Sequence, residues 1–356
     1  MRNSRIKFII ILVLASFAFF IGCQNQNKKK SESKERKELN LLNWRFYIGD
    51  NTIKNFEKEF NAIVNVNYYA SNEECYSKVK NSPGEYDIII PSDYMVDIMI
   101  NENLLSKLDM SKLPNIKHID SLFLGENKGF DFKDEYSAPY MWGSTGFARN
   151  RDYIDKEIKS WKDVFNGSSK NITVLDDIRF TLGSVLMFLD KDPNTLNKTD
   201  IEAAASYLKS NSDRIKVWTQ DSPKDMLING DALVSYAWSG DVLQAAKQNN
   251  AIEYILPEDG ALIFQDGICI PKGAPHNELA HEFINFILRP DVSAEITNTI
   301  MYGNPNTTAH QLIKPFILNN KAIFPEKEYL EKCKRIKDVG DMMDTYNELW
   351  NSIRAE

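Results

Sequence analysis

Apolar and polar residues from Leu39 onward follow a pattern that predicts an α/β protein. Short apolar runs at 39–44, 64–69 and 86–91 have the length of strands, and the segments between them, 51–60 and 73–80, have apolar residues at helical spacing. This order implies parallel βαβ units with right-handed crossovers. Ligands of such sheets bind at the carboxyl ends of the strands. We therefore expect the residues that directly follow these strands to lie near a ligand.

A second block of the same kind begins near Ser144. Its predicted strands cover 172–175, 232–238 and 261–271, and its predicted helices cover 201–209 and 281–288. The tail from 326 to 353 is predicted to be helical and to pack on this second block. The chain has 356 residues, which is enough for two domains.

The N-terminus differs from the rest of the chain. Three basic residues within the first seven precede an apolar run, 8–21, and then Gly22 and Cys23. The run is too short to span a bilayer comfortably and is typical of a signal peptide. A small residue before a cysteine resembles the bacterial lipobox, so we expect cleavage after residue 22 and acylation of Cys23. The alternative is an uncleaved membrane anchor, and in both cases the remaining chain lies on the extracytoplasmic or periplasmic side of a membrane.

Residues 23–38 are predicted to form a flexible tether, because 24–38 contain no apolar side chain that could be buried. Without residues 1–22 the chain carries 40 basic and 50 acidic residues, a net charge of −10. This charge argues against nucleic acid as a partner and is compatible with a cationic ligand. Cys75, Cys269 and Cys333 are widely spaced, so we interpret them as buried or free thiols and predict no metal site and no cofactor.

Several strings, spread in order along the chain, resemble the spermidine/putrescine-binding proteins of polyamine ABC importers. They are Asn43-Trp44 with Tyr47, Tyr86 to Ser92 with Tyr94, Pro139 to Gly143, Phe283 to Asp291, Tyr302 to Asn306, and Asp338-Val339-Gly340. The resemblance implies a monomeric, non-enzymatic binding protein that delivers its ligand to ABC permease subunits. It also implies a type II periplasmic-binding-protein fold, in which each of two lobes is a mostly parallel sheet flanked by helices, joined by crossing strands near 142–146 and 264–266. Lobe one is predicted to comprise 39–143 plus 265–311, and lobe two 144–264 plus 312–356.

A polyamine presents several ammonium groups on a methylene chain. Buried ammonium groups need carboxylates as partners, and aromatic faces cover the methylenes and attract the cations. By resemblance, the ligand-binding residues include aromatic side chains, a serine and three acids: Trp44, Tyr47, Ser92, Tyr94, Asp177, Trp238, Asp241, Phe264, Asp266 and Tyr302. We expect Asp266, on the second crossing strand, to be the central carboxylate.

Two further positions depart from the family pattern. Phe46 and Phe180 stand where the family often has acids, so we include both in the site but expect fewer charges in it. A third ammonium group would lack a full partner, which is costly in a buried site. Putrescine is therefore favoured over spermidine, unless Glu73 or Asp93 compensates. Another small cationic solute, such as an amino-acid-like cation, is the alternative ligand.

Three other functions compete with this interpretation. Paired carboxylates could indicate a glycosidase, but the chain has no nucleophile elbow, no HExxH and no P-loop. A surface lipoprotein that acts as a sensor or adhesin could use the same fold. A binder of anions or metals is disfavoured, because the candidate site is rich in acids and aromatics and contains no histidine.

Overall fold

The computed structural model describes residues 36–166, 170–219 and 223–354. The predicted signal peptide 1–22, Cys23 and most of the tether lie outside the described residues. The first strand, β1 (Lys37–Trp44), begins two residues inside the predicted tether, which is a correction. The reason is backbone pairing: Lys37 lies beside Ala62 of β2 (Ala62–Tyr69), and its N–H donates to the carbonyl of Asn61 at 3.1 Å.

The first half of the fold is built on β1, β2 and β3 (Ile88–Ile89), which are parallel as predicted. The helices that connect and cover these strands are α2 (Thr52–Phe60), α3 (Asn72–Asn81), α4 (Asp93–Asn101), α10 (Asn277–Ile287) and α11 (Pro290–Ile300). Local sequence sets their ends. Ser71 caps α3 by accepting from the N–H of Glu74 at 3.1 Å, and the Glu74 carboxylate accepts from the N–H of Ala70 at 2.8 Å.

The second half repeats the α/β pattern around β5 (Ile172–Leu175), which is parallel to both of its neighbours, β6 (Ile215–Thr219) and β7 (Val234–Trp238). A further strand, β8 (Ile252–Ile255), pairs with β4. Its helices are α5 (Trp161–Asn166), α6 (Ile178–Phe188), α7 (Lys198–Lys209), α8 (Lys224–Asn229), α9 (Ser239–Gln248) and α14 (Met342–Arg354).

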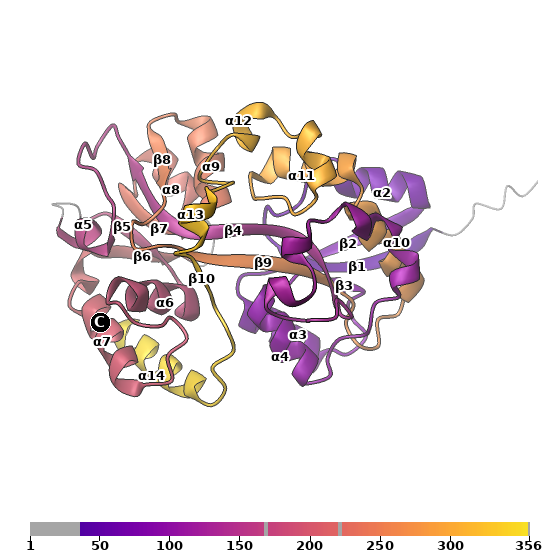
Figure 1. Cartoon of the computed structure of the whole chain (residues 1–356), viewed down its shortest axis with the longest axis horizontal. Helices are drawn as coiled ribbons and strands as arrows, with labels where there is room; N and C mark the ends of the chain where they lie inside the picture. The colour runs from indigo at the N-terminus through magenta and orange to yellow at the C-terminus, as the bar shows by residue number, and fades with distance from the viewer. Residues whose placement is uncertain (1–35, 167–169, 220–222, 355–356) are drawn as a thin grey trace, which may run out of the picture. The chain divides into compact units, whose positions relative to one another are not determined.

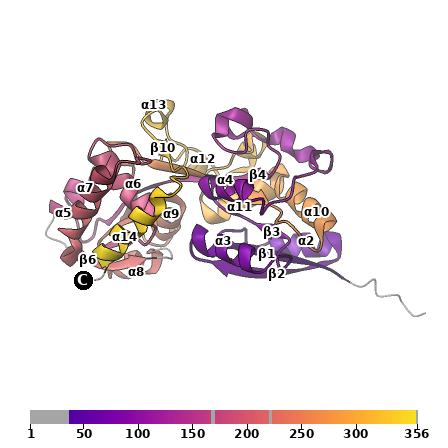
Figure 2. The same ribbon diagram turned by 90° about the horizontal axis from the view of Figure 1, so that it is seen from below.

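Two long strands join the halves. β4 (Ser137–Asn150) runs antiparallel to β9 (Leu262–Cys269) as far as Ser144, and from Thr145 it pairs with β7 and β8 instead. The strand order is β2-β1-β3-β9-β4-β7-β5-β6. Both strands cross the middle of the described chain in Figure 1, and Figure 2 shows the helices gathered around the two halves. The crossing strands therefore run antiparallel to each other, between parallel strand pairs in both halves.

The buried apolar residues also divide between the halves. One cluster contains Leu41, Ile89 and Phe283, and a second contains Phe147, Val174 and Trp350. The segment from Ile313 to Ile323 packs with α11 in a smaller cluster. The predicted lobe boundaries remain a prediction.

The C-terminal tail is only partly helical, which corrects the sequence prediction. α13 (Lys327–Leu330) and α14 are separated by a short strand, β10 (Lys334–Arg335), which pairs with β9. Lys334 and Arg335 lie beside Leu262 and Ile263 of β9, and Lys334 N–H donates at 3.0 Å to the carbonyl of Ala261, which directly precedes β9. The predicted packing of the tail on the second half is confirmed for α14. A short helix, α12 (Pro315–Leu318), precedes the tail. No helix within the described ranges has the length and hydropathy of a membrane span.

Candidate functional site

A pocket of about 780 Å³, open mouth included, lies where the ends of β1, β5 and β7 approach β9. Ten of the twelve predicted site residues line it: Trp44, Phe46, Tyr47, Ser92, Asp177, Trp238, Asp241, Phe264, Asp266 and Tyr302. They come from the first 100 residues, from the middle of the chain and from the segment after residue 260. The fold therefore gathers residues that are far apart in sequence around one cavity.

Aromatic rings form the walls of the pocket through edge-to-face contacts. The ring of Tyr302 lies 5.0 Å from that of Tyr47 and 6.0 Å from that of Phe264, between centroids. Phe264 in turn contacts Trp238 at 5.1 Å, and Trp44 packs against Tyr69 at 4.4 Å. Such contacts fix the orientation of each ring. The pocket therefore offers aromatic faces whose positions are set before a ligand arrives.

Two glycines allow this close packing. A Cβ atom at Gly240, in the first turn of α9, would lie 2.2 Å from the ring of Tyr302. A Cβ atom at Gly143, on β4, would lie 2.8 Å from Phe264 and 2.9 Å from Tyr302. All three distances are shorter than a van der Waals contact between carbon atoms. Only glycine at these two positions lets α9 and β4 approach the rings so closely.

Asp266 is the most deeply buried acid of the pocket, with 2% of its surface exposed. One carboxylate oxygen accepts from the hydroxyl of Tyr47 at 2.5 Å and the other from the hydroxyl of Ser92 at 2.7 Å. Burial raises the pKa of Asp266 from its ordinary value of 3.8 to about 7, although the two hydrogen bonds act in the opposite direction. The carboxylate is thus oriented, but no cationic side chain in the described part of the chain pairs with it.

Two further acids face the pocket from the second half. Asp177 caps α6 by accepting from the N–H of Phe180 at 2.9 Å, and burial, together with the charge of Glu73, raises its pKa to about 7. Asp241, in the first turn of α9, forms a hydrogen bond with Tyr302. Burial and then the charge of Asp241 raise the pKa of Tyr302 well above its ordinary value. Carboxylates therefore lie on both sides of the aromatic walls.

Comparison with known proteins places this site in a family. The family model described as bacterial extracellular solute-binding protein matches residues 51–325. The chain belongs to the bacterial extracellular solute-binding proteins. A spermidine/putrescine-binding periplasmic protein of Salmonella typhimurium is 34% identical to it over 346 residues, which cover 96% of this chain and 97% of the relative.

Solved structures agree with this family. A Listeria monocytogenes protein, named for a spermidine/putrescine ABC transporter, is 31% identical with a TM-score of 0.85 and covers 90% of this chain and 99% of its own. A Treponema pallidum lipoprotein is 29% identical with a TM-score of 0.80 and covers 90% of this chain and 100% of its own. The likeness confirms the predicted two-lobed α/β fold, and we call the two halves lobe one and lobe two.

Two of the predicted residues do not line the pocket of this solute-binding protein, which is a correction. Phe180 has no exposed surface, because it packs behind the wall against Trp238 at 4.8 Å and Phe264 at 6.1 Å. Tyr94 is buried in α4, and its hydroxyl donates to Glu73 at 3.1 Å. Phe180 therefore supports the aromatic wall from behind, and Tyr94 holds Glu73.

Phe46 lies at the mouth of the pocket and is 69% exposed. Its backbone has a φ of 55°, in the left-handed region, so the chain turns sharply there after β1. The ammonium group of Lys224, from α8 of lobe two, lies 5.5 Å from the centre of its ring. Phe46 thus contributes an aromatic face where the family pattern has an acid.

Neither acid that could have compensated for Phe46 and Phe180 lines the pocket. Asp93 is buried and paired with Arg335, whose guanidinium lies 2.8 Å away, and it also accepts from the N–H of Gln265 at 3.3 Å. Glu73 accepts from the hydroxyl of Tyr94, and its charge acts on Asp177. Asp93 is therefore paired with a cation, whereas Glu73 adds negative charge near Asp177 without lining the pocket.

Sequence reasoning missed six residues of the pocket wall: Arg45, Tyr69, Ala70, Leu175, Asp176 and Thr219. A signal was present for most of them, because they directly follow or end strands β1, β2, β5 and β6. Asp176 also forms an acid pair with Asp177. The strand-end rule applied to every parallel strand would have found these positions.

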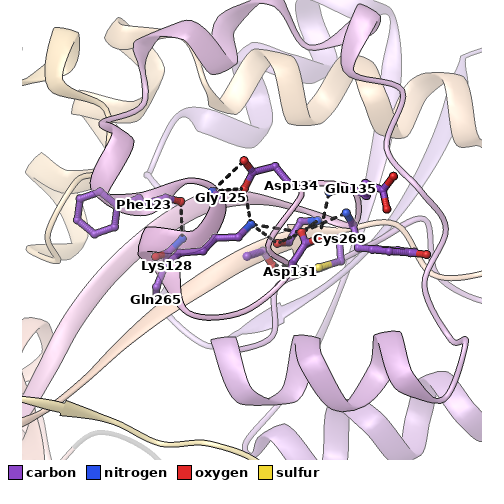
Figure 3. A network of polar contacts seen from close by, with 11 residues as sticks. Phe123, Gly125, Lys128, Asp131, Asp134, Glu135, Gln265 and Cys269 are labelled. Atoms are coloured by element: carbon purple, nitrogen blue, oxygen red, sulfur yellow. Dashed lines mark hydrogen bonds and ion pairs between the residues drawn. The ribbon is translucent and has the colours of Figure 1, made fainter.

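A buried polar cluster beside β9 supports the central strand of the site (Figure 3). The fully buried ammonium of Lys128 lies 2.7 Å from the carboxylate of Asp134 and 3.3 Å from that of Asp131. From β9, the side-chain amide of Gln265 donates to the carbonyl of Phe123 at 3.2 Å. The segment that contains Phe123 and Lys128 thus fixes Gln265, the residue directly before Asp266.

Proposed function

We propose that this protein captures a polyamine between its two lobes, with putrescine favoured over spermidine, and delivers it to an ABC permease. The observation that carries the proposal is the buried carboxylate of Asp266 within an aromatic cage. Tyr47 and Ser92 orient it, and among the described residues no cationic side chain pairs with it. The Salmonella typhimurium relative is named for spermidine and putrescine, which supports the same ligand class.

The chemistry of the pocket suits an alkyl diamine. One ammonium group can pair with Asp266 and Asp241, and the other with Asp177. Each aromatic face that a cation contacts adds about 0.5–2 kcal/mol, and the methylenes are covered by the same rings. A charged ligand also favours the ionised forms of Asp266 and Asp177, whose pKa values burial raises.

The preference for putrescine follows from the residues at both ends of the cage. Phe46 at the mouth and Phe180 behind the wall provide no carboxylate. Asp93 is paired with Arg335, and Glu73 does not line the pocket. The third ammonium group of spermidine would enter a site without a full partner, at a cost of several kcal/mol if buried. Putrescine has one charge fewer and avoids this cost.

The remaining parts of the proposal concern the place where the protein works. We propose that it is a monomer on the extracytoplasmic or periplasmic side, attached to the membrane by a lipid on Cys23. The lipobox-like sequence and the Treponema pallidum lipoprotein support the lipid anchor. Labelling cells with a palmitate analogue should label the wild-type protein, and Cys23→Ala should abolish the label and release the protein from the membrane fraction. Equal labelling of both proteins would contradict the anchor.

Thermal unfolding with a set of ligands tests the proposal. The chain from Gln24 onward would be unfolded with putrescine, cadaverine, spermidine, spermine or arginine at equal concentration. A ligand at about 100 times its Kd should stabilise the protein by roughly 2.7 kcal/mol. Putrescine should raise the Tm most, and Asp266→Asn should remove this effect while the variant stays folded.

Two outcomes would contradict the proposal. If no polyamine raises the Tm, the ligand class is wrong although the family is right. If spermidine raises the Tm more than putrescine does, the argument from Phe46 and Phe180 is wrong. A rise with arginine alone would instead favour an amino-acid-like cation.

A further inference from the structure

Asp176, beside Asp177 at the end of β5, is an acid of the pocket wall that sequence reasoning missed. Its side chain is 4% exposed. One of its carboxylate oxygens accepts from the guanidinium of Arg354 at 2.8 Å and from the indole N–H of Trp350 at 3.3 Å. Both donors belong to α14, more than 170 residues further along the chain. The C-terminal helix therefore reaches the pocket wall.

Core packing fixes α14 at this place. Trp350 is 2% exposed, and its ring packs edge-on against Trp218 of β6 at 5.0 Å. Tyr346 and Ile353 are buried in the same hydrophobic cluster of lobe two. Arg354 follows directly in the same helix, so its guanidinium is held beside Asp176 by a buried helix face. The ion pair is thus built into the fold of lobe two.

We infer that Arg354 is a specificity-determining residue, which neutralises Asp176 and so reduces the cationic charge that the pocket accepts. Among the described residues, four acids line the pocket: Asp176, Asp177, Asp241 and Asp266. With Asp176 paired, three remain for the ligand. Fewer available carboxylates favour a ligand with two charges over one with three. The inference rests on the proposed function and extends it to a residue outside the pocket.

Removing the guanidinium tests the inference. Arg354→Gln removes the cationic partner of Asp176 and leaves its carboxyl group available to the ligand, so it should strengthen binding of spermidine relative to putrescine. Arg354 is 41% exposed, and exposed pairs are screened, so the ratio of the two Kd values should change by roughly three- to fivefold. Arg354→Lys keeps the charge and should keep the wild-type ratio. Calorimetric titration of the chain from Gln24 onward with each polyamine measures both Kd values.

Removing the charge of Asp176 gives the reciprocal test. Asp176→Asn leaves the charge of Arg354 beside the pocket, so both polyamines should bind more weakly, and spermidine should lose more. The double variant R354Q with D176N again has a neutral pair and should return to the wild-type ratio. A purely structural role of Arg354 would change the Tm or weaken both ligands equally, and would leave the ratio unchanged.

A matched control removes a distant arginine. Arg289→Gln breaks an ion pair with Glu59 on lobe one and changes the net charge by the same amount, so it should not alter the ratio. If the wild type binds polyamines but R354Q leaves the ratio unchanged, the inference is wrong and the proposed function stands. If the wild type binds no polyamine, the proposed function fails and the inference with it. If R354Q does not fold, D176N decides, and an unchanged ratio there overturns the inference.

Discussion

The carboxylate of Asp266 is both fixed in orientation and buried, and both properties suit a binding site for a cation. Tyr47 and Ser92 orient its oxygens, and burial makes its charge unfavourable until a cation arrives. Asp177 has the same raised pKa in the opposite wall. A cationic ligand beside these two carboxyl groups would lower their pKa values again. The pH dependence of the protein therefore reports on these two residues.

The contribution of Asp266 to the stability of the ligand-free protein should fall as the pH rises from about 4 to about 7. The pKa of Asp266 is raised from 3.8 to about 7, so the folded state binds this proton more tightly than the unfolded state does. The resulting stabilisation is complete below the unfolded pKa and is lost by the folded pKa. Asp266→Asn cannot titrate and should show a smaller fall in Tm across this range. The exposed Asp213→Asn should behave like the wild type, and equal pH profiles for all three proteins would contradict the account.

Affinity for a polyamine should change in the opposite direction and rise from pH 5 to pH 8. Below about pH 7 the ligand must displace protons from Asp266 and Asp177 before it can pair with them. Each proton released lowers the affinity by up to about tenfold per pH unit. Calorimetry in buffers of different ionisation enthalpy measures the protons released. Affinity that does not depend on pH, with no proton release, would show that these acids are already ionised.

Individual elements place these residues through local rules and through long-range packing. The β1, β5 and β7 ends were predictable, because apolar runs mark the strands and parallel strands present ligands at their carboxyl ends. The position of Phe180 was not, since its packing behind Trp238 depends on how α6 meets β7. The partners of Asp93 and Asp176 lie on β10 and α14, far away in sequence. Nothing in the local pattern indicates such pairs.

Gly240→Ala should damage the pocket without unfolding lobe two. The added Cβ atom would overlap the ring of Tyr302, which must move or displace the start of α9. Overpacking of this kind costs about 1–3 kcal/mol. We expect a lower Tm and weaker polyamine binding. Gln248→Ala, an exposed change at the other end of α9, should affect neither, and full binding by Gly240→Ala would contradict the tight packing described here.

At the scale of the whole molecule, β4 and β9 are continuous strands that run from one lobe into the other. The pocket takes residues from both lobes, so a ligand can bind all of them only when the lobes are close together. Sequence resemblance predicted this arrangement well. The tether boundary and the short strand β10 were less predictable, since both depend on backbone pairing with a strand that is distant in sequence.

Putrescine should therefore make the protein more compact. Ligands shift an equilibrium between open and closed lobes only as far as they bind the closed form better. Small-angle X-ray scattering should show a smaller radius of gyration with saturating putrescine than without it. Asp266→Asn at the same putrescine concentration should keep the ligand-free value. An unchanged radius for wild type with bound ligand would contradict closure.

A crystal structure of the protein with putrescine would show whether the ligand pairs with Asp266 between the lobes. We expect closed lobes, one ammonium nitrogen at hydrogen-bond distance of about 3 Å from the Asp266 carboxylate, and methylenes covered by Trp238 and Tyr302. A diamine bound away from Asp266, or a pocket that stays empty at saturating putrescine, would contradict it.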